Sequence, residues 1–218
     1  MSNNSSDKHR ISIKDAAAQH LIQADPMLGK LILRIGDIEC NVHPDSFSFL
    51  VEEIIGQMLS NKMADVLIER FTNLCDGRIC SATVSKLSVT DVRALGISRA
   101  KAEYIINFAK LIESQEYSLK QIELLDDKEA MRRLTHIKGV GAWTAKMYLL
   151  FVLMRPDILP FEDAAFMQGF KWLYPDAEIT PSSVCARCSC WSPYSSIAAR
   201  YLYRAVDCGF TKMPLSEL

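Results

Sequence analysis

The residues best suited to chemistry lie in two short segments about twenty positions apart. The first, residues 134–145, reads LTHIKGVGAWTA and contains two glycines separated by one β-branched residue. This spacing permits a tight turn in which Gly139, Gly141 and the first amides of the next helix can donate hydrogen bonds to a phosphate. A plain helix–helix turn with a glycine stop gives the same pattern, so the segment alone leaves both interpretations open.

The second segment, residues 159–170, reads LPFEDAAFMQGF and places Glu162 and Asp163 at the start of an apolar helix. Acidic residues at such a place cap the helix and interact favourably with its dipole. A carboxylate can also stabilise positive charge in a transition state or activate a water molecule. The pair by itself does not separate capping from catalysis.

Helices must position these segments, because apolar residues recur at steps of three and four along most of the chain. One stripe consists of Phe47, Leu50, Val51, Ile54, Ile55 and Met58. Ser98 can cap a later helix, and Asp126 with Glu129 forms a candidate capping box. No convincing alternating strand is present, although residues 31–35 are ambiguous. We therefore expect an all-α fold, with connections too short and numerous for a simple four-helix bundle.

The composition is that of an ordinary globular protein, and its charge does not by itself indicate binding to nucleic acid. The chain has 218 residues, of which 49% are hydrophobic, and 25 basic against 26 acidic residues give a net charge of −1. A DNA-binding protein is usually more basic than this, unless backbone amides and helix N-termini supply the phosphate contacts. The absence of a long apolar run or a signal peptide, and an odd count of seven cysteines, predict an intracellular protein with reduced thiols and no membrane partner.

Together, the hairpin and the downstream aspartate resemble the helix-hairpin-helix DNA glycosylase superfamily (HhH-GPD), most closely its 3-methyladenine DNA glycosylase II branch. In that family the aspartate precedes a glycine by six positions, as Asp163 precedes Gly169. Four further blocks are similar to the family in the same order: residues 18–26, 54–60, 95–102 and 191–203. The resemblance covers most of the chain, from about His20 to Tyr203.

The resemblance implies two helical lobes with the active-site cleft between them. One lobe would comprise residues 11–45 and 156–218, and the other residues 46–155 with the hairpin. Residues 1–10 are polar, and we expect them to form a flexible tail.

The resemblance also implies a monofunctional glycosylase that flips a damaged, alkylated purine out of duplex DNA and hydrolyses its N-glycosidic bond. Asp163 would be the catalytic carboxylate, with Glu162 the weaker candidate. Trp143 stands where bifunctional relatives carry a Schiff-base lysine, which argues against strand cleavage. Two alternatives stay open: a glycosylase for an oxidised or deaminated base, and a non-catalytic helix-hairpin-helix DNA-binding protein.

Further site residues follow from the same resemblance. The candidates for the base pocket are Trp143, Tyr148, Phe166 and Trp172. The candidates for DNA contact are Gln57, Met58, Lys138, Gly139, Val140, Gly141 and Thr144. Met58 stands at the place of the side chain that fills the gap left by the flipped base, and it also continues the core stripe of its helix, so both roles are open.

The family's hairpin holds a monovalent cation, which here would be Na⁺ or K⁺ on the main-chain oxygens of Thr135, Ile137 and Val140. Catalysis is expected to need no cofactor. Cys185, Cys188 and Cys190 do not match the spacing of the family's iron–sulfur cluster, so no cluster is expected.

Three residues depart from the family pattern: Lys138 replaces a proline, Ser195 a frequent arginine and Met58 a second glutamine. The expected partner is damaged double-stranded DNA, and the expected state is a monomer.

Overall fold

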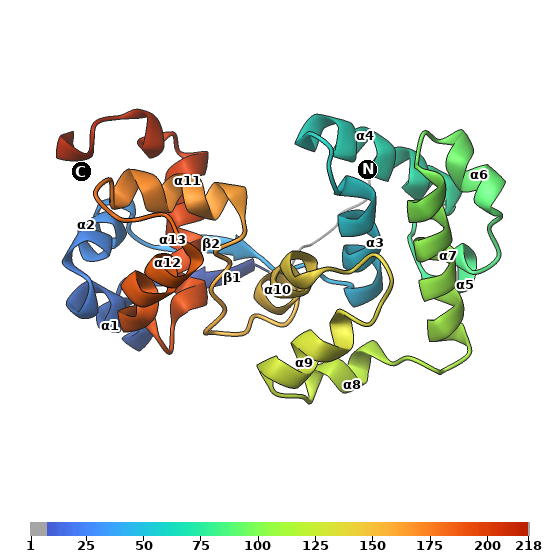
Figure 1. Ribbon diagram of the computed structural model, residues 1–218, viewed down its shortest axis with the longest axis horizontal. Coiled ribbons are helices and arrows are strands. Elements are labelled where there is room, and N and C mark those ends of the chain that lie inside the picture. The colour runs from blue at the N-terminus through green and yellow to red at the C-terminus, as the bar shows by residue number, and fades with distance from the viewer. Residues whose placement is uncertain (1–7, 218) are drawn as a thin grey trace. The chain divides into compact units, whose positions relative to one another are not determined.

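The computed structural model describes residues 8–217, and they form two compact units (Figure 1). Unit 1 combines the N-terminal part of the chain up to Val42 with the part from Leu149 onward, and unit 2 is His43–Tyr148. The boundaries therefore lie at 42/43 and 148/149, whereas the sequence placed them at 45/46 and 155/156. The second boundary falls inside a helix that contains no proline or glycine, so no residue in the sequence indicates it.

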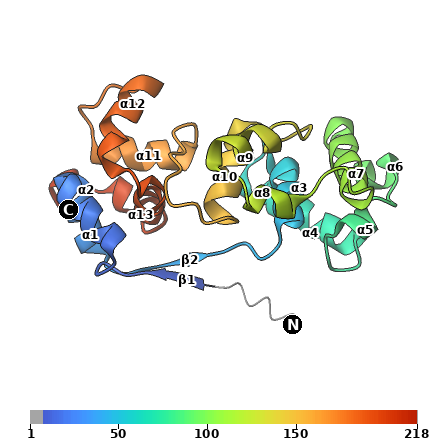
Figure 2. The same cartoon turned by 90° about the horizontal axis from the view of Figure 1, so that it is seen from below.

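The sequence missed a small sheet. Strand β1 (Lys8–Ile11) pairs antiparallel with β2 (Ile38–Asn41) (Figure 2). In their register Lys8 lies opposite Asn41. Residues 8–10 thus belong to a strand rather than to the expected tail, whose first seven residues lie outside the described part of the chain. The ambiguous residues 31–35 are helical, in α2 (Pro26–Ile35).

Unit 1 is built around its C-terminal helix, α13 (Ser195–Asp207), which contacts helices from both ends of the chain (Figure 1). Besides strands β1 and β2, it contains the helices α1 (Ala16–Ala24), α2, α11 (Ala164–Leu173), α12 (Pro181–Cys188), η1 (Ser189–Trp191), η2 (Phe210–Lys212) and η3 (Leu215–Glu217). The largest core side chains include Leu21, Leu31, Phe166, Phe170, Trp191 and Tyr201.

Helix α11 lies very close to α13 at Gly169. A Cβ atom on Gly169 would stand 3.0 Å from the Leu202 Cβ and 3.1 Å from its carbonyl oxygen. A larger residue would have to push the helices apart, because the nearest atoms are backbone or close to it. The glycine six residues after Asp163 therefore sets the distance between the two helices.

A buried carboxylate, Asp25, joins the first two helices of unit 1 to its C-terminal part. It caps α2 and accepts hydrogen bonds from the Tyr174 hydroxyl at 2.7 Å and the Trp191 indole at 2.9 Å. Arg187 pairs with it at 2.9 Å and also lies over the Tyr174 ring. Burial alone would raise the pKa of Asp25, but these hydrogen bonds outweigh it and hold the pKa below its ordinary value.

Replacing Asp25 with asparagine is expected to destabilise the protein by about 3 kcal/mol, because it leaves Arg187 without its anion. This is the low end of the range for buried pairs, since the Arg187 side chain is 34% exposed. Because the folded pKa is lowered, the stabilisation is complete at neutral pH and disappears as the pH falls through that pKa. Urea denaturation at several pH values, with Asp176→Asn as an exposed control, measures the effect. Equal stability of the two variants at pH 7 would contradict it.

Unit 2 contains eight helices within its described residues, the last of which continues into unit 1. They are α3 (Ser46–Gly56), α4 (Asn61–Leu74), α5 (Ser81–Val84), α6 (Val89–Ala94), α7 (Arg99–Glu113), α8 (Leu119–Glu123), α9 (Asp127–Leu134) and α10 (Ala142–Phe151). Buried members of its core include Leu50, Ile54, Phe71, Ile105, Phe108 and Leu134.

Ser98 and Asp126 cap helices of unit 2 as expected, but the capping box expected from Asp126 with Glu129 is only half formed. Ser98 caps α7 by accepting from the Lys101 amide, and Asp126 caps α9 by accepting from the Glu129 amide. The Glu129 carboxylate pairs with Arg132 and Arg133. None of the helices in residues 8–217 is long and apolar enough to span a membrane.

Candidate functional site

The Asp163 carboxylate stands at the N-terminus of α11 in unit 1. It is the N-cap of the helix, is partly exposed, and accepts a hydrogen bond from the Phe166 amide at 2.9 Å. Tyr203 of α13 lies beside it, and burial followed by the negative charge of Asp163 raises the pKa of the Tyr203 phenol. The Tyr203 hydroxyl oxygen is buried and meets no partner at normal hydrogen-bond geometry. The neighbouring Glu162 is exposed.

Side chains of α13 fix the segment that leads to Asp163. The Asp157 carboxylate accepts from the Ser195 amide at 3.0 Å and from its hydroxyl, and the Ser196 hydroxyl accepts from the Ile158 amide at 2.8 Å. Ser195 is therefore a buried partner of Asp157. The sequence marked Ser195 only as a departure from a frequent arginine of the family, and in the structure Ser195 anchors this segment through Asp157.

In unit 2, Gly139 and Gly141 have different roles in the hairpin. Gly139 has a φ of +92°, and a Cβ on it would stand 2.8 Å from the Tyr104 ring. Gly141 is exposed, and a Cβ on it would meet nothing within 4 Å. Gly139 is thus required by the fold of the hairpin, whereas the protein itself places no steric demand on Gly141.

Gln57 ties the end of α3 to this hairpin. Its side-chain nitrogen donates to the Gly139 carbonyl at 2.7 Å and lies 3.4 Å from the Thr144 hydroxyl. The Thr144 side chain is buried and supports the loop, which leaves only its main chain for a contact with DNA. Val140 is also buried, which leaves only its main chain for such a contact, while Lys138 is exposed.

Met58 follows Gln57 and is fully exposed, with a relative accessibility of 101%. Helix α3 ends at Gly56, and Met58 has a φ of +59° in the left-handed region. Its expected place in the core stripe is therefore wrong. The alternative role, a side chain that fills the gap in DNA, stays a prediction.

The four aromatic residues predicted for a base pocket have different surroundings. Trp143 on α10 is partly exposed. Phe166 is fully buried between Phe170 and Trp191 in the core of unit 1, so it does not line an open pocket. Tyr148 is fully buried in unit 2, and Trp172 donates its indole N–H to the Met213 carbonyl at 2.9 Å.

The predicted residues are thus shared between the two units. Unit 2 brings Gln57, Gly139 and Thr144 into contact, and unit 1 carries Asp163. Tyr203 and Lys101 lie next to predicted residues but were not selected from the sequence. Both stand in segments that resemble the family, and that position is the only signal that marked them.

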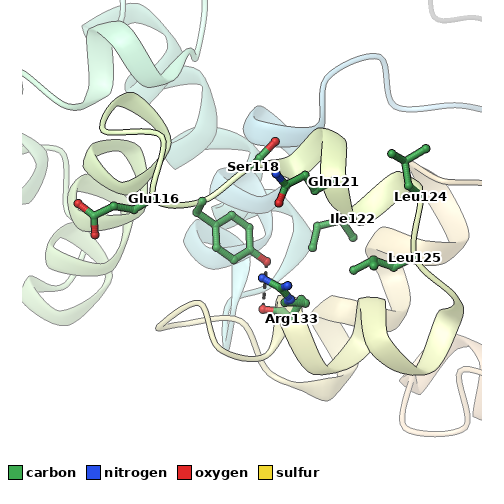
Figure 3. A pocket seen from close by; sticks show the side chains of 8 residues that line it. Glu116, Ser118, Gln121, Ile122, Leu124, Leu125 and Arg133 are labelled. Carbon is green, nitrogen blue, oxygen red and sulfur yellow. Dashed lines mark hydrogen bonds between the residues drawn. The ribbon is translucent and has the colours of Figure 1, made fainter.

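Two cavities of unit 2 differ in their relation to the predicted residues. One, of about 280 Å³, lies between α8, α9 and the segment before them (Figure 3), and none of the predicted site residues lines it. The other, of about 480 Å³, lies between α7 and the hairpin, and its lining includes Lys110, His136 and Lys138. Only the second cavity adjoins the hairpin.

The three clustered cysteines do not share a common environment. Cys188 is buried, which raises the pKa of its thiol, Cys190 is partly buried near Arg187, and Cys185 is exposed. In the described part of the chain, no three His, Cys, Asp or Glu side chains lie close enough together to hold a metal ion.

Comparison with known proteins gives consistent matches. A Bacillus subtilis protein named as a candidate DNA-3-methyladenine glycosylase is 31% identical over 74% of this chain, and the chain spans 59% of that protein. A DNA-3-methyladenine glycosidase structure from Bacillus halodurans is 28% identical, with a TM-score of 0.84 over 95% of this chain and 96% of that one. The Schizosaccharomyces pombe 3-methyladenine DNA glycosylase in complex with abasic DNA is 25% identical, with a TM-score of 0.74 over 88% and 97% of the two chains.

A protein-family profile matches a long internal part of the chain, which contains several of the motifs described above. Residues 51–193, which include the hairpin and Asp163, match the profile described as HhH-GPD superfamily base excision DNA repair protein. This chain belongs to the HhH-GPD superfamily of base excision DNA repair proteins.

Proposed function

We propose that this chain is a monofunctional DNA glycosylase that flips an alkylated purine out of duplex DNA and hydrolyses its N-glycosidic bond. The observation that carries the proposal is the partly exposed Asp163 carboxylate at the head of α11. The names of the relatives from B. subtilis, B. halodurans and S. pombe support a methylated purine as the substrate.

Hydrolysis of this bond builds positive charge on the deoxyribose. In the proposed reaction a water oxygen bonds to C1′ while the C1′–N bond breaks and its electron pair leaves on the base. Asp163 stabilises the charged sugar and orients the water, whose proton passes to the carboxylate or to solvent. An alkylated base that carries positive charge becomes neutral as it leaves, so this substrate needs no separate acid.

Trp143 supports the monofunctional form of the proposal. An amine at this place could form a Schiff base with the sugar and lead to strand cleavage, whereas an indole cannot. Its electron-rich ring would instead stack on the flipped base and favour a cationic purine by about 0.5–2 kcal/mol.

The hairpin and the Met58 loop supply the DNA contacts in this proposal. The open space around Gly141 lets a phosphate approach the backbone amides, which needs no net positive charge on the protein. Exposed Lys138 adds a cation there, and Met58 would enter the space vacated by the base.

A monovalent cation on the hairpin would add to this phosphate contact. Its donors would be the carbonyl oxygens of Thr135, Ile137 and Val140, and neutral oxygens suit Na⁺ or K⁺. Ile137 also accepts a hydrogen bond from the Val140 amide at 2.9 Å. A carbonyl oxygen has a second lone pair, so the turn and the ion are compatible.

Incubation with duplexes that contain 3-methyladenine, 7-methylguanine, hypoxanthine or 8-oxoguanine, followed by alkali, tests the proposal. We expect release of the methylated bases, strand breaks only after alkali, and no protein–DNA adduct with borohydride. Release of hypoxanthine or 8-oxoguanine alone would favour a glycosylase for a deaminated or oxidised base. Binding to DNA without release of any base would favour the alternative of a non-catalytic DNA-binding protein.

A further inference from the structure

Lys101 reaches from α7 to the end of α3 and binds two carbonyl groups there. Its ammonium donates to the Ile55 carbonyl at 2.9 Å and to the Gln57 carbonyl at 2.6 Å. The last carbonyls of a helix have no partner within the helix and form the negative end of its dipole. A partly buried cation at this point therefore fixes where and in which direction the chain leaves α3.

The chain that leaves α3 adopts a conformation it would not hold by itself. Met58 has a φ of +59° although it is not glycine, and its side chain is fully exposed, so no packing of that side chain stabilises the conformation. Such backbone conformations persist only where the surroundings impose them. The contacts that precede Met58 must supply this constraint.

Those contacts clamp Gln57 from both of its polar ends. Lys101 donates to the main-chain carbonyl of Gln57, and the side-chain amide of Gln57 donates to the Gly139 carbonyl of the hairpin at 2.7 Å. The Leu59 amide closes the turn by donating to the Gly56 carbonyl at 3.1 Å. Met58 is thus presented to solvent by a short loop that is held at α3, α7 and the hairpin, all within unit 2.

We infer that Lys101 is a positioning residue for the step in which DNA is opened, because it holds the Met58 loop in the shape that projects Met58 outward. This inference rests on the proposed function, and it assigns to Lys101 no contact with DNA or with the reacting atoms. Lysine suits the role because one ammonium carries three donors on a flexible stem and can satisfy two carbonyls at once.

A double-mutant cycle between Lys101→Met and Met58→Ala tests the inference. We expect either change to lower the single-turnover rate of base release from fully paired duplex by at least about tenfold, since displacements of about 1 Å can cost roughly a hundredfold. The double variant should be no slower than Met58→Ala, because Lys101 acts through Met58. Lys101→Arg, which keeps a cation, should recover part of the rate, and Lys86→Met is the exposed control.

A substrate that is already open separates positioning from damage to the fold. When the methylated base lies in a single-nucleotide bulge, Lys101→Met should approach the wild-type rate, because little unpairing is then required. Additive losses in the cycle, or an equal loss on the bulged substrate, would overturn the inference.

Methyl NMR of methionine-labelled protein gives a readout that needs no activity. The Met58 signal, assigned by its loss in Met58→Ala, should shift and broaden in Lys101→Leu, which removes the ammonium without adding a methionine signal, while the signal of buried Met147 stays in place. An unchanged Met58 signal would also overturn the inference. A wild-type protein that releases no base would instead defeat the proposed function, and the NMR comparison would still decide whether Lys101 orders the loop.

Discussion

Asp163→Asn is expected to lower base release by about 10²–10⁴-fold while leaving the fold and the affinity for DNA nearly unchanged. Asparagine and aspartate are similarly good N-caps, so the bond from the Phe166 amide survives and stability should change by less than about 1 kcal/mol. What disappears is the negative charge that would face the developing positive charge on the sugar. Single-turnover excision, anisotropy titration with duplex DNA and thermal denaturation measure the three quantities.

Glu162→Gln is the matched control for this prediction. It removes one negative charge from the neighbouring, exposed position and does not alter the cap of α11. We expect it to keep most of the activity. Full activity of Asp163→Asn together with loss of activity in Glu162→Gln would assign the catalytic role to Glu162. Full activity of both variants would show that neither carboxylate is needed for catalysis.

Gly139→Ala and Gly141→Ala are expected to act through different properties of the hairpin. At Gly139, the φ of +92° and the 2.8 Å approach to Tyr104 should cost about 2–4 kcal/mol of stability and weaken DNA binding as the turn distorts. At Gly141 an added methyl group enters open space, so stability should change by less than about 0.5 kcal/mol.

The affinity for DNA then shows whether a phosphate approaches Gly141. If it does, the methyl group should lower the affinity about tenfold or more, because it displaces a hydrogen bond to a charged acceptor. Thermal denaturation and anisotropy titration of both variants supply the comparison. Unchanged affinity in Gly141→Ala would show that the backbone there is not a contact surface.

Local sequence signals predicted the parts of the fold that depend on neighbouring residues. Ser98 and Asp126 cap the helices that follow them, and Asp163 caps α11, because a cap needs only the next three residues. The family membership predicted from ordered blocks of sequence is confirmed by the profile match.

The sequence failed where distant residues decide the structure. Met58 continues an apolar spacing, but Lys101 and Gln57 hold it outside the helix, and neither contact is visible from periodicity. Phe166 fits a core position or a pocket wall equally well until its packing against Trp191 is seen. Strands β1 and β2 contain four residues each and are 26 residues apart, too short and too distant for an alternating pattern to reveal.

The Asp25 cluster has a consequence for the order in which a newly made chain can fold. Arg187 and Trp191 leave the ribosome more than 160 residues after the carboxylate that they bind. Unit 2 has all of its residues by Tyr148 and can fold first, whereas the apolar faces of α1 and α2 must wait for α13 to be synthesised. Until α13 is made, we expect α1 and α2 to depend on protection of their apolar faces.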